Sequence, residues 1–288
     1  MTKGRWPGGA PFALCLTHDV DRIHKYAYHY LYYGVTGGLR GPAKQWRTLR
    51  VRMSGAEPYW NFQRIMEIEG RLGVRSTFLF LNESAHGFGP IYWGRYRIQQ
   101  PEVKRIISEL DAGGWEIGLH GSLNSYGDAD MLSREKRELE DITGKRVRSI
   151  RQHCLNFLAG KTFEIQQKAG FEVDSTIGYS NRLWNPDDGV FPYFPDGSGI
   201  LELPISVMDT VALEKAHIRK AIWVLFDSIC SAGGIMVLDW HQCKFNVEEN
   251  LQHVDIYEAL IREALSRRAW ISTMGEVADH WKTIPKER

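Results

Sequence analysis

Eight short runs of apolar and β-branched residues recur along the chain, separated by segments of helical periodicity. The runs that predict strands are 13–17, 76–81, 115–119, 149–152, 171–175, 200–204, 234–240 and 270–273. The segments that predict helices are 59–72, 101–112, 131–143, 161–169, 213–232, 247–268 and 274–282. Strands that alternate with helices form parallel sheets through right-handed crossovers. This pattern predicts an α/β protein, a distorted (β/α) barrel with about seven parallel strands.

The chain of 288 residues is predicted to form one domain, 1–288, because no repeat or flexible linker divides it. A domain of this length buries roughly 75% of its unfolded surface, so it needs no disulfide or metal to fold. The four cysteines form no C-x-x-C pair, which leaves a cysteine-rich zinc module unsupported. No signal peptide and no apolar run of ~18 residues is present, so we expect a cytoplasmic protein.

Polar residues follow four of the predicted strands where each strand ends. Asp19 and Asp21 come after the first strand, and they share one side of an extended chain. His120, the pair Arg151 and His153, and His241 follow three later strands. In a barrel of this kind the residues just beyond the carboxyl ends of the strands face one mouth. The sequence therefore predicts a shared active site, since two close carboxylates repel unless a cation or proton lies between them.

The overall charge is balanced, with 36 Lys and Arg against 35 Asp and Glu and a net charge of +1. This balance gives no basic signal for nucleic acid, and we expect no nucleic-acid partner. One insert, at about 22–56, has seven Lys or Arg, five Tyr, and no Asp or Glu. It is interpreted either as a solvated helical excursion or as a cover over the mouth. A cover of this composition suits a sugar, an anionic glycan, a nucleotide-linked or lipid-linked sugar, or a membrane surface.

Five short motifs, in order between residues 13 and 241, resemble those of the polysaccharide deacetylases, the NodB-homology enzymes of the carbohydrate esterase type. LTHDVD stands where that family has T-F-D-D-G or a D-x-D variant, and HGSLN where it has H-[ST]-x-x-H. RQHCLNF, DSTIGYSNRLW and VLDWH occupy the places of the three later motifs. The resemblance implies a distorted barrel of about seven strands, in agreement with the strand pattern. It also implies a divalent metal, for which we expect zinc.

By position, the resemblance assigns a role to each polar strand end. Asp19 matches the general base, and Arg151 matches the arginine that keeps this base ionised. Asp21 matches the metal-binding carboxylate, and His120 matches the first metal histidine. His241 matches the general acid that protonates the departing amine.

The second metal histidine of the family is replaced here by Asn124. A carboxamide is a poorer zinc ligand than an imidazole. His153 stands where the family usually has proline, and it could supply the missing imidazole or only line the cleft. The third ligand beside Asp21 and His120 is therefore left open between His153 and Asn124.

Five further residues are predicted to line the substrate site: His18, Ser122, Tyr179, Trp184 and Asp209. For Asp209 two interpretations remain, because a carboxylate at this point could orient His241 or cap a helix.

The leading functional hypothesis is a metal-dependent hydrolase of C–N bonds that removes an N-acetyl group, or an O-acetyl group, from a sugar or a surface polysaccharide precursor. The first alternative is a metal-independent, allantoinase-like amidase that acts on a small substrate. The second is a catalytically inactive relative that binds carbohydrate. The retained base and acid, Asp19 and His241, argue against this last alternative.

Overall fold

In the computed structural model, residues 5–36, 41–83, 94–195, 198–211, 213 and 215–284 are described. Nine strands form one sheet in the order β6-β5-β4-β3-β2-β1-β8-β7, and β9 pairs with β1. They are β1 (Ala13–Val20), β2 (Thr77–Leu81), β3 (Glu116–Gly121), β4 (Ser149–Gln152), β5 (Val173–Asp174), β6 (Leu201–Glu202), β7 (Val207–Met208), β8 (Ile235–Asp239) and β9 (Trp270–Ser272). Every pairing between these strands is parallel, which confirms the predicted α/β class.

One segment, 201–208, joins the two ends of the sheet. Its first part pairs with β5, and the backbone N–H of Leu203 donates to Asp174 O at 2.9 Å. Its second part pairs with β8, and the backbone N–H of Ser206 donates to Val237 O at 2.9 Å. The sheet therefore curls into a distorted barrel, as predicted, although the predicted strand 200–204 is divided between β6 and the loop before β7.

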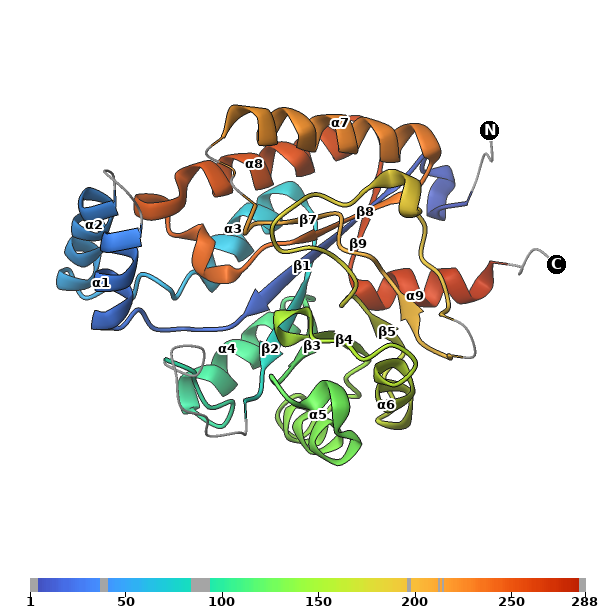
Figure 1. Cartoon of the computed structure of the whole chain (residues 1–288), viewed down its shortest axis with the longest axis horizontal. Helices are drawn as coiled ribbons and strands as arrows, with labels where there is room; N and C mark the ends of the chain where they lie inside the picture. The colour runs from blue at the N-terminus through green and yellow to red at the C-terminus, as the bar shows by residue number, and fades with distance from the viewer. Residues whose placement is uncertain are drawn as a thin grey trace.

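The helices lie around the outside of the curved sheet (Figure 1). They are α1 (Ala27–Thr36), α2 (Gly41–Met53), α3 (Phe62–Leu72), α4 (Pro101–Ala112), α5 (Ala129–Thr143), α6 (Thr162–Lys168), α7 (Ala216–Ala232), α8 (Val247–Ser266) and α9 (Met274–Thr283). Their buried residues recur at helical spacing; α4, for example, buries Val103, Ile106, Ile107 and Leu110. No helix in the described ranges is both long and apolar enough to cross a membrane.

Strand β1 crosses the middle of the sheet and is buried along its whole length. It extends three residues beyond the predicted end at Thr17, so His18 and Asp19 lie within the strand. Successive side chains of a strand point to opposite faces. Thr17 and Asp19 both accept from Arg151, whereas His18 contacts Glu69 of α3 on the other face.

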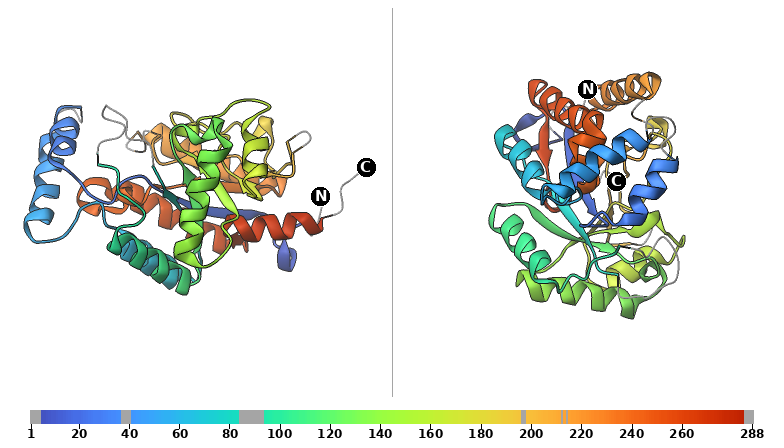
Figure 2. Two further views of the ribbon diagram at one scale, coloured as in Figure 1. Left: turned by 90° about the horizontal axis from the view of Figure 1, so that it is seen from below. Right: turned by 90° about the vertical axis from the view of Figure 1, so that its left-hand side faces the viewer.

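The basic aromatic insert forms a helical hairpin, α1 and α2, apart from residues 37–40, which lie outside the described ranges. The hairpin lies beyond the carboxyl end of β1, at the left of Figure 1 and of the left view in Figure 2. A buried polar network fixes it to α8. Lys25 Nζ donates to Gln45 Oε1 and to Glu249 Oε2, each at 2.6 Å, and Gln45 Nε2 donates to Glu249 Oε1 at 2.8 Å.

Candidate active site

The carboxyl ends of β1, β3, β4 and β8 bring the predicted chemical residues together. His120 on β3 is the register partner of Arg151 on β4, and Thr17 on β1 is the partner of Asp239 on β8. Asp21 follows β1, and His241 follows β8. Residues far apart in the sequence thus meet at one edge of the sheet, as the strand pattern predicts.

Asp19 is the most firmly held carboxylate of the group. Arg151 Nη1 donates to Asp19 Oδ1 at 2.8 Å, and both side chains are almost completely buried. Burial alone would raise the pKa of Asp19, but the Arg151 guanidinium and the His120 imidazole outweigh it and lower the pKa. Asp19 is therefore an ionised carboxylate inside the protein, as a general base must be.

His120 presents one ring nitrogen to both aspartates of the D-x-D pair. Its Nδ1–H donates to the carbonyl oxygen of Arg151 at 3.0 Å, which leaves Nε2 as the nitrogen with a free electron pair. Nε2 lies 3.3 Å from Asp21 Oδ1 and 3.5 Å from Asp19 Oδ2. Asp21 Oδ1 is buried and has no hydrogen-bond partner among the described residues. Electron pairs that face one another in this way repel unless a proton or cation lies between them.

His153 completes a group of three with Asp21 and His120, whose potential ligand atoms all lie within 4.8 Å of one another. His153 begins the short helix η4 (His153–Leu155), and its Nε2 lies 3.6 Å from Asp21 Oδ2. Arg95, which the sequence did not point to, also reaches this position. Its Nη2 donates to His153 Nε2 at 2.8 Å, and its Nη1 donates to the Asp21 carbonyl at 2.9 Å. A cationic side chain thus already stands beside two of the three potential ligands.

Asn124, the other candidate for the third ligand, has an exposed side chain. It precedes the short helix η3 (Ser125–Gly127). His120 and His153 are buried at 2% and 4% exposure. Of the two candidates for the third ligand, His153 is therefore buried in the cleft beside His120, whereas Asn124 is exposed.

His241 is held by Asp209, which follows β7. The ring Nδ1–H donates to Asp209 Oδ1 at 2.9 Å, and the backbone N–H donates to Asp209 Oδ2 at 2.6 Å. Of the two interpretations of Asp209, orientation of His241 therefore agrees with these contacts. Burial opposes protonation of His241, but Asp209 and Asp239 outweigh it and raise the pKa of His241 well above its ordinary value.

Asp239 is a buried carboxylate at the centre of the site that the sequence analysis missed. Its Oδ1 lies 3.1 Å from Arg151 Nη1, yet neither carboxylate oxygen has a hydrogen-bond partner among the described residues. Burial is the main cause that raises its pKa to about 7. The neighbouring Asp19 also raises the pKa, whereas Arg151 lowers it. Asp239 also groups with Asp19 and His241 within 4.8 Å. Arg151 Nη1 lies against a carboxylate oxygen of both acids in this second group.

Two of the predicted substrate-binding residues are fully buried. His18 is fully buried; its Nδ1 bonds to Trp240 O at 2.7 Å and its Nε2 lies 2.9 Å from Glu69 Oε1. Ser122 is fully buried and donates to Glu135 Oε1 at 2.5 Å. These contacts leave neither His18 nor Ser122 with a free polar atom at the surface, so the structure gives no support to the substrate-binding role predicted for them.

Tyr179 and Trp184 are partly exposed, and their rings stack at 5.7 Å between centroids. Trp184 lines a small separate cavity with Val190 and Ile235. Because Ile235 begins β8 while His241 follows its end, Trp184 lies toward the opposite end of that strand. The substrate-binding role of Tyr179 and Trp184 stays a prediction.

No protein-family model matches the chain, and no curated protein matches it. Solved structures do match over nearly the whole chain. A candidate polysaccharide deacetylase from Mycobacterium smegmatis is 18% identical, with a TM-score of 0.62 over 98% of this chain and 95% of that one. A probable polysaccharide deacetylase from Pseudomonas aeruginosa PAO1 is 16% identical, with a TM-score of 0.64 over 98% and 95%. Puue allantoinase is 15% identical, with a TM-score of 0.65 over 98% and 94%.

These matches confirm the resemblance at the level of the fold. The chain has the NodB-like fold that polysaccharide deacetylases and an allantoinase share. One fold carries several chemistries, so the activity has to be argued from the site itself.

Proposed function

We propose that the protein is a metal-dependent hydrolase that removes the acetyl group from an N-acetylated sugar or surface polysaccharide precursor. The observation that carries the proposal is that a candidate general base and a candidate general acid lie in one cleft. An ionised aspartate, Asp19, is held by Arg151, and a protonated histidine, His241, is held by Asp209. Amide hydrolysis needs such a base and such an acid together.

The residues between the base and the acid fit a divalent metal. Asp21 offers a buried oxygen without a hydrogen-bond partner among the described residues, and His120 offers Nε2. His153 would be the third ligand, and one carboxylate with two imidazoles is a common catalytic set for zinc. A metal bound there would polarise the acetyl carbonyl and make a water molecule more acidic.

The chain's own residues account for the proton transfers. Asp19 accepts the proton of the water molecule that adds to the acetyl carbon, and Arg151 keeps the carboxylate ionised for this step. His241 gives its Nε2 proton to the nitrogen of the sugar as the C–N bond breaks, and Asp209 keeps the ring oriented. The products are acetate and a free amine, and the two catalytic side chains exchange protons with solvent before the next cycle.

Acetate release from a panel of N-acetylated sugars and oligosaccharides, with metal supplied, tests the proposal. We expect release from at least one member by the wild-type protein. The Asp19→Asn variant should release none above background, which excludes a contaminating deacetylase. A panel on which the wild type and the variant behave alike would contradict the proposal.

A second candidate is a metal-independent amidase, and one contact favours it. Arg95 donates to His153 Nε2, the same nitrogen that would bind a metal, so a guanidinium could supply the positive charge. The fold likeness to Puue allantoinase is compatible with this alternative. Full activity in a chelator, on a small amide rather than a sugar, would establish it.

A further inference from the structure

A cavity of about 320 Å³ opens directly beside His241. It lies between the catalytic end of the barrel and the α1–α2 hairpin. Its lining residues are Asp21, Arg22, Tyr33, Gly41, Lys44, Gln45, Tyr59, Thr210, His241, Cys243, Lys244, Glu249 and Asn250. The volume is in the range of pockets that bind small molecules.

Two lysines in this lining form no ion pair with the described residues. Lys44, on α2, and Lys244, on the short helix η6 (Gln242–Phe245), are both half-buried. Neither side chain donates a hydrogen bond or forms an ion pair with any residue that the structure describes. Burial works against the charge of Lys244, but Asp209 and other neighbours outweigh it, and the pKa of Lys244 is raised. Two cations therefore stand in one cavity without a carboxylate in direct contact among the described residues.

The acidic residues near these lysines are already paired. Glu249, in the same lining, accepts from Lys25 at 2.6 Å and from Gln45 at 2.8 Å. Asp209 is held by His241, and Asp21 lies between His120 and His153. The lining is thus left with excess positive charge. The same Lys25–Glu249–Gln45 contacts hold the hairpin wall in place before a ligand arrives.

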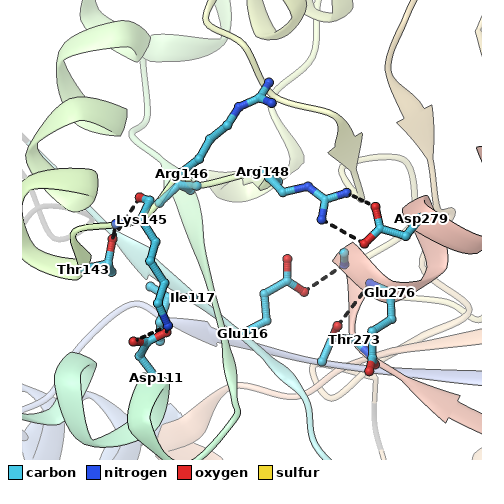
Figure 3. A pocket seen from close by; sticks show the side chains of 12 residues that line it. Asp111, Glu116, Ile117, Thr143, Lys145, Arg146, Arg148, Thr273, Glu276 and Asp279 are labelled. Carbon is cyan, nitrogen blue, oxygen red and sulfur yellow. Dashed lines mark hydrogen bonds and ion pairs between the residues drawn. The ribbon is translucent and has the colours of Figure 1, made fainter.

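A second cavity, of about 230 Å³, provides the contrast (Figure 3). It lies at the opposite end of β3, where the basic residues are paired side by side with acids. Lys145 Nζ lies 2.7 Å from Asp111 Oδ1, and Arg148 Nη1 donates to Asp279 Oδ2 at 3.0 Å. The lysines of the two cavities thus differ: Lys145 is paired with an acid, whereas Lys44 and Lys244 have no such pair among the described residues.

We propose that the cavity beside His241 binds a phosphate group of the substrate through Lys44 and Lys244. This inference rests on the proposed function and narrows it to sugars that carry a phosphate. Lysine is a compact cation that suits phosphate oxygens.

The chemistry of such sugars matches the layout of the cavity. In a 2-acetamido sugar 1-phosphate, the amide and the phosphate are attached to neighbouring ring carbons. Lys244 follows His241 by three residues, and both line the same cavity. An amide placed at His241 would therefore bring the phosphate to the lysines. Sugars linked through a diphosphate to a nucleoside or to a lipid share this chemistry.

Calorimetric binding tests the inference without turnover, in the Asp19→Asn background. We expect N-acetylglucosamine 1-phosphate to bind about tenfold or more tighter than N-acetylglucosamine, as one charged hydrogen bond would give. Replacing both Lys44 and Lys244 with Met should remove this preference and leave binding of the neutral sugar unchanged. Lys161→Met, at an exposed lysine outside the cavity, is the matched control. Equal binding of the two sugars, or a preference that survives the double replacement, would overturn the inference.

Two further ligands test whether the phosphate of the substrate belongs to a nucleotide or to a lipid. They are uridine diphosphate N-acetylglucosamine and, in detergent, polyprenyl diphosphate N-acetylglucosamine. Tighter binding of one of them than of the 1-phosphate supports the inference and names the source, whereas weaker binding of both counts against it. Acetate release separates this inference from the proposed function. Lysine-dependent phosphate binding with no acetate release from any sugar would overturn the function alone. Release from neutral sugars, unaffected by loss of the lysines, would overturn the phosphate site alone.

A different observation, the outer surface of the α1–α2 hairpin, supports a second inference. Seven of the twelve large hydrophobic side chains that are exposed in the described residues lie between 26 and 53. The most exposed are Val35 at 75%, Met53 at 74% and Leu31 at 71%. Arg47 and Arg50 are exposed on α2, and residues 22–56 contain no acid. Exposed apolar side chains together with cations are typical of surfaces that bind anionic membranes.

We propose that this hairpin docks on an anionic lipid bilayer. Co-sedimentation with vesicles of phosphatidylglycerol should recover the protein, and vesicles of phosphatidylcholine should recover far less. Leu31→Asp with Val35→Asp should abolish recovery, whereas Leu265→Asp with Val224→Asp, at exposed positions on α8 and α7, should not. Absence of binding to phosphatidylglycerol, or a dimer in solution that the hairpin variant alone dissociates, would overturn this inference.

Discussion

Arg151 faces two carboxylates with a single positive charge. Its Nη1 lies 2.8 Å from Asp19 Oδ1 and 3.1 Å from Asp239 Oδ1, and all three side chains are buried. One guanidinium cannot stabilise both anions equally in a medium of low dielectric constant. The pKa of Asp19 is lowered and that of Asp239 is raised by their surroundings, so Asp239 keeps its proton to a higher pH than Asp19 does.

The first prediction follows from this difference. Asp19→Asn should reduce acetate release by about 10²–10⁴-fold, because a carboxamide cannot accept a proton, while metal content stays unchanged. Asp239→Asn is the matched control, since a carboxamide resembles a protonated carboxyl, and we expect its loss to be below about tenfold. Steady-state kinetics on both variants would contradict the assignment of the base if the order of the two losses were reversed.

The second prediction concerns the third metal ligand. His153→Ala should abolish stoichiometric metal binding, and Asn124→His should change it little, because residue 124 is exposed. Metal content by elemental analysis checks both variants. Tighter zinc binding in Asn124→His, together with full retention in His153→Ala, would instead make residue 124 the ligand.

The third prediction is a shift in the pH profile. In the proposed mechanism the acid form of His241 is the active one, so we expect activity to fall as the pH rises through its pKa. Asp209 raises this pKa, and Asp209→Asn should therefore lower it and move the basic limb of the kcat/KM profile to lower pH. An unchanged basic limb in that variant would show that another group donates the proton.

At the scale of elements, the α1–α2 hairpin is attached to the barrel through a buried charge. The side chain of Lys25 is fully buried, and its ion pair with Glu249 links the insert to α8. Removing one partner of a buried pair leaves an uncompensated charge, which destabilises a protein far more than loss of an exposed pair.

The fourth prediction applies this comparison. Glu249→Ala should lower the free energy of unfolding by about 3 kcal/mol. Glu258→Ala, which removes the more exposed pairs with Arg71 and Arg262, should cost less than about 1 kcal/mol. Urea titrations of the two variants provide the measurement. Equal losses would mean that the hairpin is held by apolar packing instead.

Local patterns were enough to predict the fold and the gathering of several polar residues at one edge of the sheet, because the carboxyl ends of parallel strands lie at the same edge. The apolar runs that end in Asp19, His120, Arg151 and His241 had to place these residues at one edge. Strand alternation would also have placed His18 on the face opposite Asp19, where Glu69 of α3 binds it.

Other parts of the site depend on contacts that no local pattern contains. Asp239 lies inside an apolar run. Its partner Arg151 is distant in the sequence, so only the folded structure shows that the two side chains meet. Arg95 belongs to a loop between β2 and α4, and only tertiary structure brings it to His153. The one signal in the sequence is a charged residue inside an apolar run, because burying a charge without a partner is costly.

At the scale of the whole molecule, the central claim is that Asp21, His120 and His153 hold a metal on which hydrolysis depends. The most direct test is acetate release by the purified protein before chelation, after chelation, and after zinc is restored, with metal content measured at each stage. We predict one metal ion per chain when the protein is active, loss of activity with the metal, and recovery of both on adding zinc. Undiminished acetate release from a protein shown to be free of metal would contradict the account.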